Sequence, residues 1–119
     1  MEPVKISLPL KSEYVMIARL AAAGYCTRAG LDIEKTEDIK VIISEVLNKC
    51  VINSAGGSEN ISVEFDKDNG YLTVAFELKD IKKAFKTGDD DDFGISIISA
   101  LCGEMSFDGD ELLLLKFSL

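Results

Sequence analysis

The 119-residue sequence contains no histidine and only three cysteines. Without histidine, the chain has no Ser–His or Cys–His nucleophile pair and none of the imidazole ligands common in zinc sites. Cys26, Cys50 and Cys102 are scattered among apolar residues and form no C-x-x-C motif. We therefore expect buried, reduced thiols.

Long apolar segments are also absent. No run approaches the roughly 20 residues of a membrane-spanning helix, and the N-terminus lacks the basic start and apolar stretch of a secretory signal. These absences predict a cytoplasmic protein without a membrane partner.

Basic residues are outnumbered by acidic ones. The chain has 13 lysines and arginines and 21 acidic residues, which gives a formal charge of −8. Nucleic-acid binders need a basic face, and no basic patch appears here, so we expect no nucleic-acid partner. The acidity is typical of a solvated surface, or alternatively it steers a basic protein partner. The run Asp89 to Asp92 is interpreted as solvated loop, with a cation site as the alternative.

Apolar periodicity predicts a strand and two helices in the first half of the chain. Residues 4–8 alternate like a half-buried strand. A helix over 13–29 follows, with Ser12 as its N-cap and Gly30 as its stop. A second helix, capped by Asp32 or Thr36, carries a continuous apolar stripe and ends at 55–57.

Two hairpins are predicted in the second half. One turns at Asn69-Gly70 and the other at Asp108-Gly109. Between them we expect a short helical turn near 81–85 and a third helix over 93–101. The continuously apolar Leu112–Leu115 indicates a strand that is central in the sheet or covered on both sides.

This element order predicts a single domain over residues 1–119 in the α+β class. We expect a two-layer α/β sandwich, in which three helices cover one face of a mixed, mainly antiparallel sheet.

The second helix carries a motif, Ser44-Glu45 followed by Asn48-Lys49, through which the chain resembles the anti-sigma factor serine kinases of the histidine-kinase-like ATPase superfamily. Segments 13–20 and 37–40 support the similarity, which is strongest over 5–55. The resemblance implies a Bergerat-type ATPase fold. It also implies a sigma factor, a small antagonist protein of that factor, or both as partners, and a possible homodimer.

Two positions of the family's nucleotide site fall on this helix. The resemblance implies that Glu45 matches a glutamate that acts on the attacking nucleophile, and that the magnesium-binding asparagine four residues later is replaced by Lys49. An ammonium group has no lone pair and cannot bind a metal. Asn48 is one residue early, about 100° around the helix, and should point elsewhere.

Two further positions follow from the same resemblance. Phe76 stands where the family has an aspartate that hydrogen-bonds adenine, and Glu77 should face the other side of its strand. Gly94 matches one glycine of the phosphate-binding turn, but Asp92 and Phe93 replace flexible residues there. Acidic neighbours would repel a phosphate at this helix N-terminus.

The resemblance, together with these replacements, implies an anti-sigma-factor-like regulatory domain that acts by protein–protein binding, with ATP binding and kinase activity lost or weak and no cofactor. One alternative is an active serine-protein kinase that phosphorylates an antagonist, using ATP and magnesium, Glu45 as base, and Lys49 and Gly94 around the phosphates. A second alternative is an unrelated α/β interaction domain. Glu45 and Lys49 also have the spacing of a helix salt bridge, and Arg19 is either a solvated residue or a partner anchor.

Overall fold

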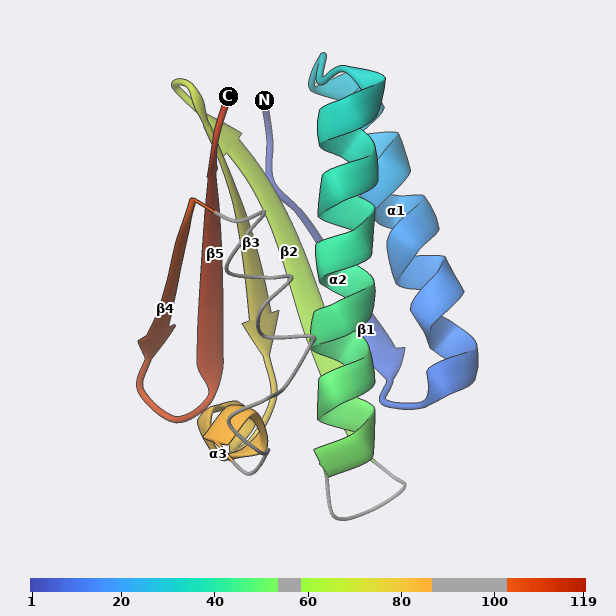
Figure 1. Ribbon diagram of the computed structural model, residues 1–119, viewed down its shortest axis with the longest axis vertical. Coiled ribbons are helices and arrows are strands. Elements are labelled where there is room, and N and C mark those ends of the chain that lie inside the picture. The colour runs from blue at the N-terminus through green and yellow to red at the C-terminus, as the bar shows by residue number, and fades with distance from the viewer. Residues whose placement is uncertain (54–58, 87–102) are drawn as a thin grey trace.

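The computed structural model describes residues 1–53, 59–86 and 103–119 (Figure 1). Its elements in chain order are β1 (Val4–Pro9), a 3-10 turn (Ser12–Tyr14), α1 (Val15–Arg28), α2 (Ile33–Asn53), β2 (Asn60–Asp68), β3 (Tyr71–Glu77), α3 (Ile81–Lys86), β4 (Glu104–Asp108) and β5 (Leu112–Ser118).

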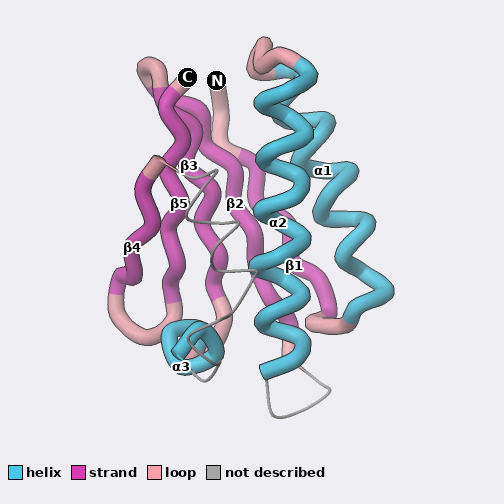
Figure 2. Tube along the Cα trace, in the orientation of Figure 1, coloured by secondary structure: helices cyan, strands magenta, loops and turns pink. Residues whose placement is uncertain are grey.

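The five strands form one sheet in the order β1-β2-β3-β5-β4, and each of the four described pairings is antiparallel. Helices α1 and α2 lie side by side over one face of this sheet, as Figure 2 shows, and α3 lies at one end of it. The predicted α+β sandwich is confirmed. The short turn predicted near 81–85 is α3, whereas the helix predicted over 93–101 lies outside the described residues.

The core lies between the sheet and α2. Alternate residues of the three inner strands and one stripe of α2 are buried there. They are Ile61, Val63, Phe65, Leu72, Val74, Phe76, Leu113, Leu115 and Phe117 from the strands, and Ile39, Ile42, Ile43, Val46, Leu47 and Cys50 from α2. The strand β5 lies inside the sheet, as its apolar run predicted, and its Leu112 and Leu114 are half-buried on the opposite face.

The ends of α1 show one confirmed and one wrong prediction. Gly30 has a φ of +85°, and its N–H donates to the Thr27 carbonyl at 3.1 Å, while the Leu31 N–H donates to the Cys26 carbonyl at 3.0 Å. These two bonds form a glycine stop of the Schellman type. Ser12 is not an N-cap, because the chain first makes a 3-10 turn there and the α-helix begins at Val15 without a side-chain cap.

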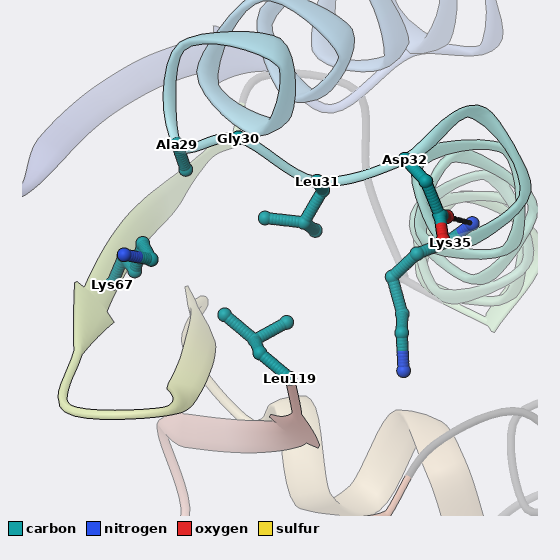
Figure 3. Close-up of a pocket in the computed structure, with 7 residues that line it drawn as sticks. All are labelled: Ala29, Gly30, Leu31, Asp32, Lys35, Lys67 and Leu119. Atoms are coloured by element: carbon teal, nitrogen blue, oxygen red, sulfur yellow. Dashed lines mark hydrogen bonds between the residues drawn. The ribbon is translucent and has the colours of Figure 1, made fainter.

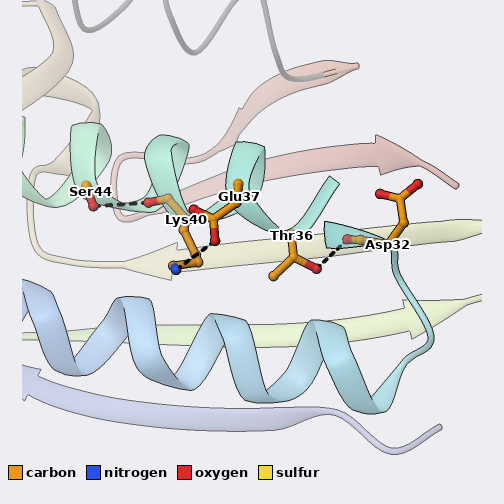
Figure 4. Close-up of polar contacts among 5 residues, drawn as sticks. All are labelled: Asp32, Thr36, Glu37, Lys40 and Ser44. Atoms are coloured by element: carbon orange, nitrogen blue, oxygen red, sulfur yellow. Dashed lines mark hydrogen bonds and ion pairs between the residues drawn. The ribbon is translucent and has the colours of Figure 1, made fainter. Parts of the chain in front are cut away.

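Asp32 caps α2, as predicted. Its Oδ1 accepts a hydrogen bond from the Lys35 N–H at 2.7 Å. Its carbonyl accepts one from the Thr36 hydroxyl at 2.8 Å (Figure 4). Thr36 therefore supports the first turn from inside the helix instead of capping it.

Replacing this cap gives a first test of the fold. Asp32→Ala is expected to lower the free energy of unfolding by about 1 kcal/mol, because an N–H in the first turn loses its acceptor. Asp32→Asn keeps a side-chain oxygen and is the matched control, with a loss of only a few tenths of a kcal/mol. Urea unfolding followed by circular dichroism measures both. An equal loss in the two variants would contradict the capping role.

Candidate functional site

The motif that suggested a function lies in the C-terminal half of α2. The Ser44 hydroxyl donates to the Lys40 carbonyl one turn earlier at 3.0 Å, so it is used within the helix (Figure 4). Glu45 is half-buried, and Asn48 is exposed. Asn48 thus points away from the core, as its position one residue before Lys49 predicted.

Lys49 is buried, with only 6% of its surface exposed. Its Nζ lies 5.7 Å from the ring centroid of Phe85 in α3, close enough for a cation–π contact. The predicted Glu45–Lys49 salt bridge is wrong, since among the described residues the ion pairs join Lys5 to Glu77 and Lys40 to Glu37. The physical reason is that the Lys49 side chain is buried beside α3.

Phe76 is fully buried on the core face of β3. Its strand neighbours are Val63 on β2 and Leu113 on β5, both fully buried as well. Glu77 points to the other face, as predicted, and its carboxylate lies 3.4 Å from the Lys5 ammonium group. The aromatic ring is thus part of the packed interior.

The helix α3 lies between α2 and β4 and contacts both. The Asn53 side-chain amide, at the end of α2, donates to the Ala84 carbonyl at 2.8 Å. On the other side, the Phe85 and Phe107 rings meet edge to face, with centroids 6.0 Å apart. Through these contacts α3 connects α2 to β4 and holds Phe85 against Lys49. Sequence reasoning missed this role, although the apolar pair Ile81 and Phe85 signalled a buried helical turn.

Part of the predicted site is not described. Gly94, the Asp89 to Asp92 run and Cys102 lie outside the described residues. Of the residues predicted for the nucleotide site, the structure therefore describes Glu45, Lys49 and Phe76.

A cavity of about 340 Å³ lies elsewhere, beside the loop between α1 and α2 (Figure 3). Leu31 and Leu119 form its apolar wall, and Lys35 and Lys67 supply positive charge. The Lys35 ammonium group donates to the Ser118 carbonyl at 2.9 Å. Lys35 and Lys49 are separated by about 20 Å along α2, so this cavity is separate from the predicted nucleotide positions.

The two described cysteines are free and fully buried, as expected. Burial raises the pKa of the Cys26 thiol to about 11. Burial also raises the pKa of Cys50 to about 12, although the positive charge of Lys49 acts in the opposite direction. Both thiols are therefore protonated near neutral pH. In the described part of the chain, none of the helices combines the length and apolar character needed to span a bilayer.

Comparison with solved structures identifies proteins of similar fold. The fold is similar to the RsbU and RsbW domains of Rv1364c from Mycobacterium tuberculosis, with a TM-score of 0.74 and 16% identity, over 99% of this chain and 32% of that one. A chain of the SiaB–SiaC complex from Pseudomonas aeruginosa gives a TM-score of 0.65 and 12% identity, over 98% and 88%. At these identities the likeness concerns the fold alone.

Sequence comparison gives the family. No protein-family model matches the chain. The serine-protein kinase RsbW of Listeria innocua is 30% identical over 131 aligned residues, covering 92% of this chain and 82% of the relative. RsbW of Oceanobacillus iheyensis is 32% identical over 89 residues, covering 67% and 56%. The chain belongs to the RsbW serine-protein kinase family.

Proposed function

We propose that this chain is an anti-sigma-factor-like regulator that acts by binding protein partners, with ATP and magnesium binding lost or weak. The partners are a sigma factor, an antagonist protein of that factor, or both. Membership in the RsbW family supports the regulatory role and these partners. A chain of similar fold occurs in the SiaB–SiaC complex. This likeness supports a role for the present chain within a protein complex.

The burial of Phe76 carries the proposal. The family resemblance predicts adenine recognition by a carboxylate at this position, and the ring that replaces it accepts no hydrogen bond. Phe76 has no exposed surface and packs between Val63 and Leu113. A nucleotide base could reach this position only if the ring left the core.

Lys49 is a second argument for lost or weak ATP binding, because it opposes the binding of magnesium. Its buried ammonium group stands where the resemblance predicts a magnesium ligand, and like charge there opposes a divalent cation. A micromolar ligand corresponds to about −8 kcal/mol. Losing one charge-assisted hydrogen bond costs roughly 1.5–3 kcal/mol, and losing the metal contact costs at least as much again. These losses weaken a micromolar affinity for ATP to about 0.2 mM or beyond. The Phe76 ring, which fills the predicted base position, weakens it further.

Titration calorimetry with ATP and magnesium tests this directly. We expect no saturating binding isotherm at ATP concentrations up to about 1 mM. A dissociation constant below about 100 μM, near −5.5 kcal/mol, would instead favour the active serine kinase, with Glu45 as its base.

Two variants sharpen the titration. Lys49→Asn places an amide oxygen at the predicted metal position, and we expect it to leave ATP affinity undetectable, because Phe76 still fills the predicted base position. Lys79→Asn, at an exposed lysine after β3, makes the same charge change away from the site. Tight magnesium-dependent ATP binding by Lys49→Asn alone would show that the lysine is the only block.

The partner half of the proposal has its own test. The tagged chain, expressed in its native cell, should co-purify with a sigma factor or its antagonist, identified by mass spectrometry. Recovery of neither would count against the regulatory role, whatever the calorimetry shows.

A further inference from the structure

The cavity beside the loop between α1 and α2 lies at the end of the sandwich that is remote from α3 (Figures 1 and 3). Its volume of about 340 Å³ is within the range of small-molecule sites. Segments far apart in the sequence meet there, namely the α1–α2 loop, the first turn of α2 and the ends of β2 and β5. We call it the end cavity, and its chemistry is set by Leu31, Asp32, Lys35, Lys67 and Leu119.

Lys67 stands on the core face of β2, where the alternation of the strand predicts an apolar residue. Val63 and Phe65 precede it on the same face and are fully buried, and its partner in the sheet is the buried Leu72 of β3. Its backbone N–H donates to the Tyr25 hydroxyl at 2.9 Å, so α1 holds this part of the strand in place. Lysine is rarely favourable on a core face, and its presence here indicates a role other than packing.

The ammonium group of Lys67 is available to a ligand, because it forms no hydrogen bond or ion pair with any residue that the structure describes. Lys35 uses one of its three ammonium N–H groups on the Ser118 carbonyl, at 2.9 Å. The Asp32 carboxylate accepts the Lys35 backbone N–H. The side chains that line the end cavity thus carry two positive charges and one negative charge, although the whole chain has a formal charge of −8.

The space between the two lysines has an apolar wall. Figure 3 shows the side chains of Leu31 and Leu119 pointing toward each other there. Leu31 is half-buried against the core, and Leu119 continues the core face of β5 beyond Phe117. An apolar chain that covered these two leucines would release the water beside them, which favours binding.

We propose that the end cavity binds a small carboxylate that carries a short apolar chain. The Lys67 ammonium group pairs with the carboxylate, and Leu31 and Leu119 cover the chain. A lining with one excess positive charge suits a monoanion better than a phosphate dianion. The apolar wall adds affinity only for an anion that has a chain. The inference concerns a ligand and does not depend on the proposed regulatory function.

Titration of the untagged, ¹⁵N-labelled chain with octanoate, followed by NMR, tests the site. We expect saturable shifts of the amide signals of Gly30, Leu31 and Lys67, with a dissociation constant of about 0.1–1 mM, as the usual affinity per atom of so small a ligand implies. Octan-1-ol has the chain without the charge, and acetate has the charge without the chain. At the same concentration, each should shift these signals by less than about a tenth as much.

Two variants separate the charge from the apolar wall. Lys67→Met keeps an unbranched side chain and should weaken octanoate binding about 10-fold, through loss of one charge-assisted hydrogen bond. It should remain at least as stable to urea as the wild type, because an apolar side chain then completes the core face of β2. Leu119→Ser, at a residue that is 43% exposed, should weaken binding about 3-fold to 10-fold.

Lys79→Met is the matched control, because it removes the same charge at an exposed lysine after β3 and should leave the octanoate affinity unchanged. Wild-type affinity in both Lys67→Met and Leu119→Ser would overturn the proposal. Equal shifts with octan-1-ol and octanoate would also overturn it, since the lysines would then play no part. Shifts that spread over the sheet without saturation would exclude a defined site at the end cavity.

Discussion

Replacing Phe76 by alanine is expected to lower the free energy of unfolding by about 3–5 kcal/mol. The ring is fully buried between Val63 and Leu113, so its removal leaves a cavity that the surrounding strands cannot readily close. Urea unfolding at 25 °C, followed by circular dichroism, measures the loss. Such a loss would place the side chain among the main contributors to the stability of the domain.

Phe107→Ala is the matched control for this experiment. Phe107 lies on the edge strand β4 and is only half-buried, so its removal should cost roughly 1–2 kcal/mol. A loss below about 1 kcal/mol for Phe76→Ala would mean that the ring is loosely packed and can be removed at little cost, as in an empty ligand site. That result would contradict the packing that carries the proposed function.

The second large effect concerns alkaline pH. The pKa of Cys50 is raised to about 12 in the folded chain, whereas an unfolded thiol titrates near 8.5. Below about pH 8 the thiol is neutral in both states, and the stability that it contributes is fully present. As pH rises further, the unfolded state loses this proton and the folded state keeps it. The free energy of unfolding should therefore fall by up to about 1.4 kcal/mol per pH unit until pH approaches 12.

Comparison of variants isolates this contribution. Between pH 8 and pH 10.5, the wild type should lose about 2.5 kcal/mol more stability than Cys50→Ala, because the variant lacks the titrating group. Val46→Ala, a truncation at a buried apolar residue of the same helix, should keep the wild-type pH dependence. An unchanged pH slope in Cys50→Ala would mean that the thiol already ionises in the folded chain.

Local signals in the sequence predicted most of the fold. Asn69 and Gly70 have positive φ angles of 20° and 86°, which few other residue pairs adopt, and they form the turn between β2 and β3. The glycine stop of α1 depends in the same way on the backbone freedom of Gly30. The stripe on α2 was predictable because its spacing matches the helical period and its residues have no other place to be buried.

Features that depend on distant contacts were not predictable. Glu45 and Lys49 have favourable spacing on one helix, but the lysine is instead buried beside Phe85, 36 residues later. Ser12 has the chemistry of an N-cap, yet the 3-10 turn moves the start of the helix to Val15. The exposure of Met16, Ile17 and Leu20 on α1 was not predictable either, because apolar spacing does not show which apolar side chains of a helix remain exposed.

The sheet topology determines where attached polypeptide would emerge. β1 starts and β5 finishes at the end of the sheet that carries the Asn69-Gly70 turn, and the Leu119 N–H donates to the Gly70 carbonyl at 2.8 Å. The two strands are three strand spacings apart, about 14 Å, and Figure 1 shows both chain termini at the end remote from α3. A tag or a fused domain at either terminus would therefore leave the surroundings of Lys49 and Phe85 unobstructed. A linker of only about five residues would be long enough to close the chain into a ring.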